Sequence, residues 1–346
     1  MRYEAEPASS MRSAAHALFA TQYPPYEQLS RRIAYSFPMR FVLGFDGGGT
    51  KTECVLMDES RRILARSRSG PSNPTRIGLE AAFRALQEAA EQALTASGVP
   101  AAEIAAIQGG IAGMGVPELN SGLAGKLKHA FPNAAVVLDT DLSVALAATQ
   151  ELPSLVVIAG TGSAAIGRRS PGRFAREGGL GPLLGDPGSA YDIGRKAAVL
   201  GLRHFPSRED SPLGREILRA FHCNWQELQN QIRANAESVL PKIFPIVTKA
   251  ANQGDRSAQA ILGSAAEELF QLAAGVIQSL ELQQQPFFLA KVGGVFGRSR
   301  FFDDPFDAFV AKIAPNVRIG PLPHPIAEFA ALTAVESLNA RVKNAG

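Results

Sequence analysis

Residues 41–52 of this chain have the sequence FVLGFDGGGTKT, and this stretch decides the fold. An apolar run ends there in three glycines and a threonine, which predicts a strand followed by a tight turn. A second such run, LVVIAGTGS, occupies residues 155–163, and the acidic segment VLDTDLSV lies between the two at residues 137–144. In such turns the missing side chains let backbone N–H groups approach an anion closely. Two phosphate-type turns and a carboxylate together indicate a phosphoryl-transfer site.

Neither turn matches the better-known nucleotide motifs. In the first, Gly44 and Gly49 have the Walker A spacing, but Thr50 follows where Lys is required, and TECVLMD continues as a strand. In the second, GTGSAA fits a loosened dinucleotide fingerprint, but IGRRSPGR indicates a strand and a turn where a helix is needed. Both turns are therefore predicted to be hairpins between antiparallel strands. One glycine-rich hairpin alone indicates only turn geometry, whereas two in duplicated positions favour phosphate binding.

Composition limits the classes of function. The 346 residues are enough for two domains, and 46% hydrophobic and 19% charged residues are typical of a globular protein. A net charge of +3 without a Lys/Arg run gives no reason to expect nucleic acid as a partner. Cys54 and Cys223 are isolated, which makes a disulfide framework, a zinc site and a Cys-bound iron–sulfur centre poor hypotheses. No apolar run is predicted to span a bilayer, and the expected location is the cytoplasm.

The order of predicted elements repeats along the chain, which predicts an α/β fold with a weak internal duplication. Each half has the βββαβαβα order of a ribonuclease-H-like domain, and helices are inserted in the second. The first half is predicted from strands 41–45, 52–57 and 63–67, helix 79–94, strand 104–111, helix 118–130, strand 134–138 and helix 141–150. The second half is predicted from strands 155–159 and 164–168, a polar stretch to Gly188, helices within 189–282, strands 287–292 and 316–319, and helix 326–342. We expect a poorly ordered extension at 1–38, a first domain from 39–152 and 325–346, and a second from 153–324.

Three aspartates have the positions that this chemistry needs. Asp141 follows a predicted strand and opens a helix, where it can be an N-cap, a general base or both. Asp139 competes for the role of base, and we favour Asp141 because it lies beyond the strand end. Asp186, in LLGDPGSAY, allows the same two interpretations. Asp46, beside the first turn, is placed to hold Mg²⁺ through water.

Five segments resemble the BadF/BadG/BcrA/BcrD-type ATPase family, and within it the N-acetylglucosamine kinases of the sugar kinase/Hsp70/actin superfamily. They are FDGGGTKT, TDLSVA, IAGTGS, GGLGPLLGDPGSAY and KVGGVF, and the resemblance runs from about Met39 to the C-terminus. It implies two actin-like ATPase domains, ATP and Mg²⁺ as cofactors, and a small amino sugar as substrate. A homodimer is compatible with it, and neither nucleic acid nor a membrane is expected as a partner.

The resemblance also implies roles for individual residues. Asp141 would take the proton from the sugar hydroxyl, and Asn73, Gly179, Leu180, Gly181 and Asp186 would contact the sugar. ATP would be bound by Gly48, Gly49, Thr50, Lys51, Gly160, Thr161, Gly162, Gly294 and Arg298.

Three positions depart from the family pattern. Leu180 replaces a Trp and Pro187 a Glu in the sugar loop, and Phe329 stands where the family often has Gly. Because Leu180 has no ring face to stack on a sugar, we expect relaxed specificity among hexosamines. The predicted function is ATP-dependent phosphorylation of N-acetylglucosamine or a related hexosamine at the 6-hydroxyl. Glucosamine kinase and a non-catalytic sugar- or nucleotide-binding regulator are the alternatives.

Overall fold

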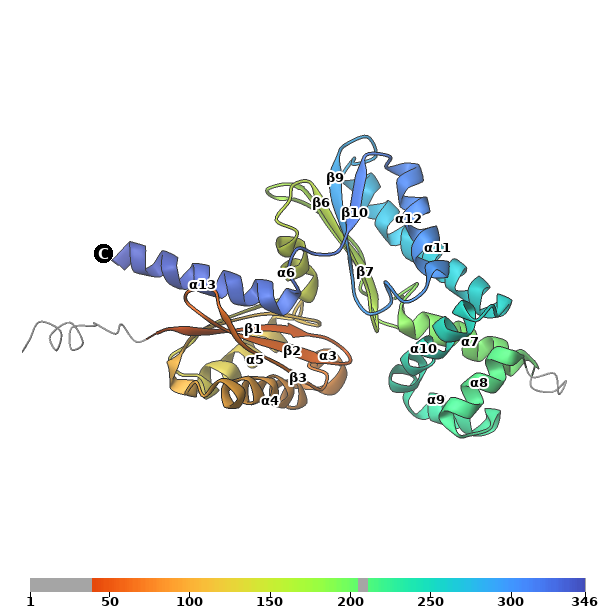
Figure 1. Ribbon diagram of the computed structural model, residues 1–346, viewed down its shortest axis with the longest axis horizontal. Coiled ribbons are helices and arrows are strands. Elements are labelled where there is room, and N and C mark those ends of the chain that lie inside the picture. Colours follow the sequence, from red (N-terminus) through yellow and green to blue (C-terminus); the bar gives the residue numbers. More distant parts are fainter. Residues whose placement is uncertain (1–38, 205–210, 346) are drawn as a thin grey trace, which may run out of the picture. The chain divides into compact units, whose positions relative to one another are not determined.

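A computed structural model describes residues 39–204 and 211–345 of the chain (Figure 1). It has two mixed β-sheets with helices packed on them, so the predicted α/β class is confirmed. The predicted N-terminal extension, residues 1–38, lies outside the described residues.

The first sheet has the strand order β3-β2-β1-β4-β5. Its central strand β1 pairs antiparallel with β2 and parallel with β4. The hairpin predicted at the first glycine turn is therefore confirmed. The strands are β1 (Phe41–Gly47), β2 (Thr52–Asp58), β3 (Ile63–Ser69), β4 (Ile104–Ile111) and β5 (Ala135–Asp139). The helices in this part of the chain are α3 (Pro74–Ile77), α4 (Leu79–Ser97), α5 (Pro117–Ala130) and α6 (Asp141–Ala148), with the 3-10 turn Ala101–Glu103 before β4.

The second sheet repeats this topology in the order β10-β9-β6-β7-β8. Strand β6 takes the place of β1: it pairs antiparallel with β7 across the second glycine turn and parallel with β9. The hairpin predicted there is also confirmed, and the shared topology agrees with an internal duplication. The strands are β6 (Ser154–Ala159), β7 (Ser163–Ser170), β8 (Arg173–Gly178), β9 (Phe287–Val292) and β10 (Val317–Gly320).

Two elements of this part were missing from the sequence prediction. Strand β8 occupies part of the stretch to Gly188 that was described only as polar, and α12 was not predicted at all. The predicted helical region between β8 and β9 is present. The helices are α7 (Ala190–His204), α8 (Pro212–Phe221), α9 (Trp225–Val239), α10 (Phe244–Asn252), α11 (Arg256–Ser279), α12 (Arg300–Ile313) and α13 (Ile326–Ala345), with a 3-10 turn at Leu240–Lys242.

The last helix of the chain packs on the first sheet. Helices α4 and α5 cover one face of that sheet, and α13 covers the other (Figure 1). Gly44 on β1 makes the close approach of α13 possible, because a Cβ there would lie 2.1 Å from the carbonyl oxygen of Ala327. The two ends of the described chain thus share one core.

Helix α6 contacts strands of both sheets. Its residues Ala145 and Leu146 share a buried cluster with Val156 of β6 and Phe288 of β9. Asp141, the first residue of α6, is therefore held at a junction between the two halves of the fold.

Helix α11 is the most apolar long helix of the described residues. It is long and apolar enough, by length and composition alone, to cross a membrane. In the fold, however, it packs against β7, β8 and α12, and Leu262, Leu269 and Val276 are fully buried in the core of the second half. Its apolar face is therefore part of a protein interior.

Candidate active site

The first glycine turn connects β1 and β2 and is braced by backbone hydrogen bonds. Gly48 N–H donates to the carbonyl of Lys51 at 2.9 Å, and the carbonyl of Gly48 accepts from Ser72 N–H at 3.1 Å. Lys51 forms an ion pair with Glu53, two residues further along the chain. The turn is thus a fixed strip of backbone with the exposed Thr50 beside it.

The second glycine turn is held in the same manner by the region that follows β8. Gly160 N–H donates to the carbonyl of Gly162 at 2.9 Å, and the carbonyl of Gly160 accepts from Ala190 N–H at 2.8 Å. Ser163 Oγ donates to the carbonyl of Pro187 at 2.7 Å. The start of α7 and the loop before it therefore fix the position of this turn.

The two turns meet. Thr50 Oγ1 and Thr161 Oγ1 lie 2.5 Å apart, although 111 residues separate them in sequence. Equivalent turns from the two sheets therefore bring their threonine hydroxyls to one small region. Hydroxyls and backbone N–H groups of glycine turns are groups that can bind phosphate.

Two carboxylates lie beside the first turn. The pKa of Asp46 is raised from 3.8 to about 7, mainly by burial and also by the nearby charges of Asp141 and Glu53, while Lys51 opposes the rise. Burial also raises the pKa of Asp141, against the opposing effects of the Leu142 N–H bond and of Arg176. A carboxylate whose pKa is raised is a stronger proton acceptor than an ordinary aspartate.

The N-cap of α6 is Thr140, which corrects one of the two roles allowed for Asp141. Thr140 Oγ1 accepts from Ser143 N–H, three residues further on, at 3.0 Å. The Asp141 carboxylate instead accepts from the N–H of the next residue, Leu142, at 3.0 Å. The competing Asp139 is exposed and accepts from Thr140 N–H at 2.6 Å. Because capping is done by Thr140, the Asp141 side chain is available for other chemistry.

The predicted sugar loop has a backbone that favours glycine. Gly179 and Gly181 have φ of 67° and 83°, in the left-handed region, and Asp186 has φ of 60°. Asp186 is only 4% exposed, and one of its carboxylate oxygens lies 2.7 Å from where a Cβ of Gly162 would be. Leu180 by contrast is 66% exposed. The loop thus places Asp186 against the second turn and leaves Leu180 uncovered.

Asn73 acts as the N-cap of the short helix α3. Its Oδ1 accepts from Thr75 N–H at 3.0 Å and from the Thr75 hydroxyl at 2.6 Å. This bonding fixes the plane of the amide, so that its NH₂ group is oriented as a donor. A Cβ on Gly113 would lie 2.5 Å from the same oxygen, so Asn73 also borders the segment after β4.

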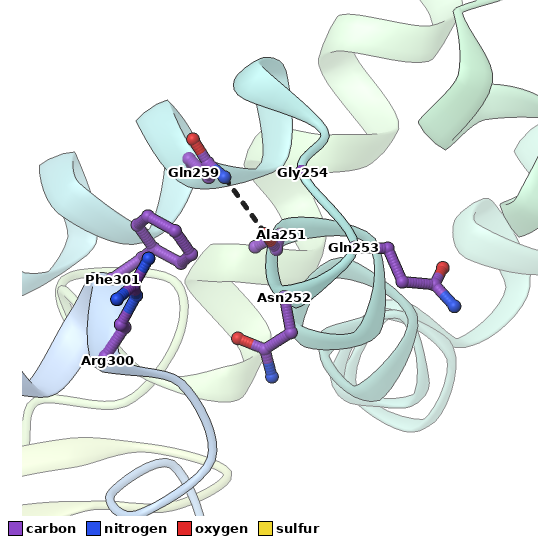
Figure 2. A pocket seen from close by; sticks show the side chains of 7 residues that line it. All are labelled: Ala251, Asn252, Gln253, Gly254, Gln259, Arg300 and Phe301. Atoms are coloured by element: carbon purple, nitrogen blue, oxygen red, sulfur yellow. Dashed lines mark hydrogen bonds between the residues drawn. The ribbon is translucent and has the colours of Figure 1, made fainter.

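The segment after β9, which contains Gly293 and Gly294, lies next to a cavity. Gly293, with φ of 103°, packs on the carbonyl of Ala159, and Arg298 Nε donates to the carbonyl of Gly294 at 3.4 Å. Asn252 Nδ2 donates to the carbonyl of Arg298 at 3.1 Å. The adjoining cavity has a volume of about 340 Å³ and lies between the end of α10 and the start of α12. Figure 2 shows the residues that line it, which are Ala251, Asn252, Gln253, Gly254, Gln259, Arg300 and Phe301.

Sequence reasoning missed several charged groups at this site. Arg76 on α3 forms an ion pair with Glu237 on α9 and lies close to Gly49. Arg176 on β8 acts electrostatically on Asp141, and Glu53 acts on Asp46. Neither arginine belongs to a recognisable motif, because the groups that it meets come from distant parts of the chain.

The residues beside the first turn suit Mg²⁺. This ion takes oxygen ligands and is usually held by one or two carboxylates together with substrate phosphates. Asp46 and Asp141 supply carboxylates whose mutual repulsion a cation would relieve. Within residues 39–204 and 211–345, no group of three or more His, Cys, Asp or Glu side chains could hold a metal by itself. The set that fits is therefore carboxylates plus the phosphates of a bound nucleotide.

Comparison with curated proteins finds relatives over most of the chain. An N-acetylmuramic acid/N-acetylglucosamine kinase of Clostridium acetobutylicum is 32% identical over 286 residues, which cover 81% of this chain and 94% of the relative. An N-acetyl-D-glucosamine kinase of Dictyostelium discoideum is 27% identical over 305 residues, which cover 80% and 92%.

Solved structures share the fold. One from Chromobacterium violaceum, provisionally named an N-acetylglucosamine kinase, has a TM-score of 0.69 and 26% identity and covers 85% of this chain and 98% of its own. A glucokinase of the ROK family from Streptomyces griseus, in complex with glucose and AMPPNP, has a TM-score of 0.54 at 17% identity and covers 86% and 99%. The sequence model of the BadF/BadG/BcrA/BcrD ATPase family matches residues 43–329. The chain therefore belongs to this family, as its sequence motifs predicted.

Proposed function

We propose that this chain is an ATP-dependent kinase that phosphorylates N-acetylglucosamine or a related hexosamine at the 6-hydroxyl. The observation that carries the proposal is the contact between Thr50 and Thr161, which joins two equivalent glycine turns beside Asp46 and Asp141. The class of sugar follows from the names of the relatives in Clostridium acetobutylicum and Dictyostelium discoideum, which align over most of this chain.

ATP would lie across the two turns, with its base in the cavity after α10. Backbone N–H groups and hydroxyls of the turns bind the phosphates, and Lys51 adds a positive charge. The cavity adjoins Arg298 through Asn252, and its volume and polar lining suit a purine ring. The phosphate-binding residues are Gly48, Gly49, Thr50, Lys51, Gly160, Thr161 and Gly162, and those beside the adenosine are Gly294 and Arg298.

The sugar would lie between Asp141 and the loop that contains Asp186. Asp141 accepts the proton of the acceptor hydroxyl as its oxygen attacks the γ-phosphorus. Asn73 donates a hydrogen bond through its oriented amide, and the buried Asp186 accepts from a sugar hydroxyl. The remaining contacts come from the backbone of Gly179, Leu180 and Gly181.

Positioning accounts for much of the rate in this scheme. In phosphoryl transfer the protein contributes mainly alignment and stabilisation of charge, because little covalent chemistry is required of it. A Mg²⁺ ion held by Asp46 through water would neutralise phosphate charge when bound. Closure of the two halves on the substrates would exclude water, which would otherwise compete with the sugar as acceptor.

Finer parts of the proposal concern organisation. We assign residues 39–152 and 325–346 to one ribonuclease-H-like domain and 153–324 to the other, and we treat α7–α11 as an insertion in the second. The shared strand topology and the packing of α13 on the first sheet support this division. A cytoplasmic location and a homodimer complete the proposal.

Glucosamine kinase is the nearest alternative activity. A glucosamine kinase of Vibrio cholerae is 28% identical over 166 residues, 48% of this chain. The exposed Leu180 supports weak selection for the acetamido group, since an aliphatic side chain there cannot stack on it.

The proposal is tested by ADP release from the purified chain with ATP, Mg²⁺ and one sugar at a time. The sugars are N-acetylglucosamine, glucosamine, N-acetylmuramic acid and glucose, and ³¹P NMR of the product identifies the hydroxyl that is phosphorylated. We expect sugar-dependent ADP release with the hexosamines. Binding of sugar and nucleotide without any ADP release would instead support a non-catalytic regulator.

A further inference from the structure

Arg76 is a partly buried cation outside the set of residues that the motifs identify. It is the third residue of the short helix α3, and its side chain is only 18% exposed. Its Nε donates to Glu237 Oε2 at 2.5 Å, which connects α3 with α9 across 161 residues of sequence. An arginine on a four-residue helix beside the site needs a reason to be enclosed, because guanidinium groups usually remain solvated.

The groups around Arg76 belong to the proposed phosphate site. A Cβ on Gly49 would lie 2.5 Å from Arg76 Nη1, so the guanidinium borders the first glycine turn. Thr50, the next residue, contacts Thr161 of the second turn. Asp186 lies against Gly162 of that turn, and burial raises the pKa of Asp186 while the positive charge of Arg76 opposes that rise. Arg76 is therefore a cation close to residues of both turns.

The partner of Arg76 is suited to being exchanged. The Glu237 side chain is 49% exposed, so water can replace the arginine as its partner more readily than at a buried carboxylate. Glu237 also follows a kink in α9 at Asn235, where φ is −158° and ψ is 77°. The pair with Glu237 therefore holds the arginine in place without binding it strongly.

We propose that Arg76 leaves Glu237 for the phosphoryl group during transfer and stabilises its negative charge there; this inference rests on the proposed kinase function. In the reaction a sugar oxygen forms a bond to the γ-phosphorus, and the bond from that phosphorus to the bridging oxygen breaks. The electron pair leaves with ADP, and the proton of the hydroxyl passes to Asp141. Arg76 gives up no atom: its planar N–H donors match the phosphoryl oxygens, as a point charge on lysine does not.

The test compares three variants in steady-state kinetics with ATP and the best sugar. Arg76→Gln removes the charge, Arg76→Lys keeps the charge without the planar fork, and Glu237→Gln removes only the resting partner. We expect Arg76→Gln to lower kcat roughly 10²-fold or more, with a smaller change in the KM for ATP, as for other arginines that stabilise phosphoryl transfer. Arg76→Lys should recover part of the loss, and Glu237→Gln should stay within about fivefold of wild type.

A merely structural ion pair gives a different result, because breaking it from either side has the same effect. Equal losses in Arg76→Gln and Glu237→Gln, or a near-normal kcat in Arg76→Gln, would overturn the inference. Binding of ADP with aluminium fluoride and sugar provides a second measurement, in which Arg76→Gln should bind this mimic much more weakly while keeping its ADP affinity. Equal weakening of both would also count against the role. A wild-type chain without activity on any sugar refutes the kinase proposal itself, whereas an active wild type with unaffected Arg76 variants refutes only this inference.

Discussion

Replacing Asp141 with Asn removes the proposed base while keeping the fold around it. The cap of α6 is Thr140, and the amide oxygen of Asn can still accept from Leu142 N–H. Loss of general-base catalysis should lower kcat by roughly 10²–10⁴-fold. ATP affinity should persist, because the glycine turns are untouched.

The same substitution should not destabilise the protein. Burial raises the pKa of Asp141, which means that the folded state disfavours the ionised carboxylate. The protonated carboxyl therefore contributes stability at low pH, and this contribution is lost as the pH rises through the raised pKa. Asn relieves this cost at neutral pH but gives up a helix N-terminal charge that contributes about 0.3–1 kcal/mol. We therefore expect a Tm equal to or above that of wild type.

The assay pairs steady-state ADP release with thermal unfolding, and Asp139→Asn is the matched control. Asp139 is an exposed carboxylate two residues away, at the end of β5, and its substitution should leave kcat within a few-fold of wild type. The reasoning is refuted if Asp139→Asn removes activity while Asp141→Asn keeps it. A drop in both Tm and kcat for Asp141→Asn would show that Asp141 supports the fold.

Three further predictions follow from the same structure. Burial raises the pKa of Asp141 and Arg176 opposes that rise, so the acid limb of the kcat/KM profile should lie above the ordinary aspartate pKa of about 3.9. Arg176→Gln should shift this acid limb to higher pH. Leu180→Trp should lower the KM for N-acetylglucosamine, an effect of about 1–3 kcal/mol at most, whereas the same change at Leu183, 94% exposed in the same loop, should not. Gly44→Ala should force α13 away from β1 and so lower the unfolding free energy, measured by urea titration, by about 1–3 kcal/mol. The control Gly125→Ala on α5, which has open space around it, should be neutral or stabilising.

The parts of the fold that sequence predicted are those with a strong periodic pattern. The central strands of both sheets are apolar runs, and their hairpins follow from glycine turns. Strand β8 was missed because RFAREG is an edge strand with mostly exposed residues, so it lacks the apolar alternation that marks a strand. Helix α12 contains Pro305, yet Phe302, Phe306 and Val310 are buried at helical spacing, a signal that was present in the sequence.

The parts of the site that sequence could not predict depend on distant contacts. A motif places Thr50 and Thr161 in their turns, but only the fold shows that their hydroxyls meet. Arg76 has no motif at all, because the groups that define its surroundings come from the turns, α9 and the loop before α7. Capping of α6 by Thr140 rather than Asp141 is a difference of one residue, which is within the ordinary uncertainty of helix boundaries.

The two halves share the topology of their sheets but differ in the side chains that they bring to the site. Strands β1 and β6 hold equivalent positions and lead into equivalent turns, and a turn binds phosphate through its backbone. The side chains differ: β1 carries Asp46 just before its turn, where β6 carries Ala159, and the α6 that follows β5 begins with Asp141. In the proposed mechanism the first half supplies the carboxylates for proton and cation, and the second supplies the cavity for the base.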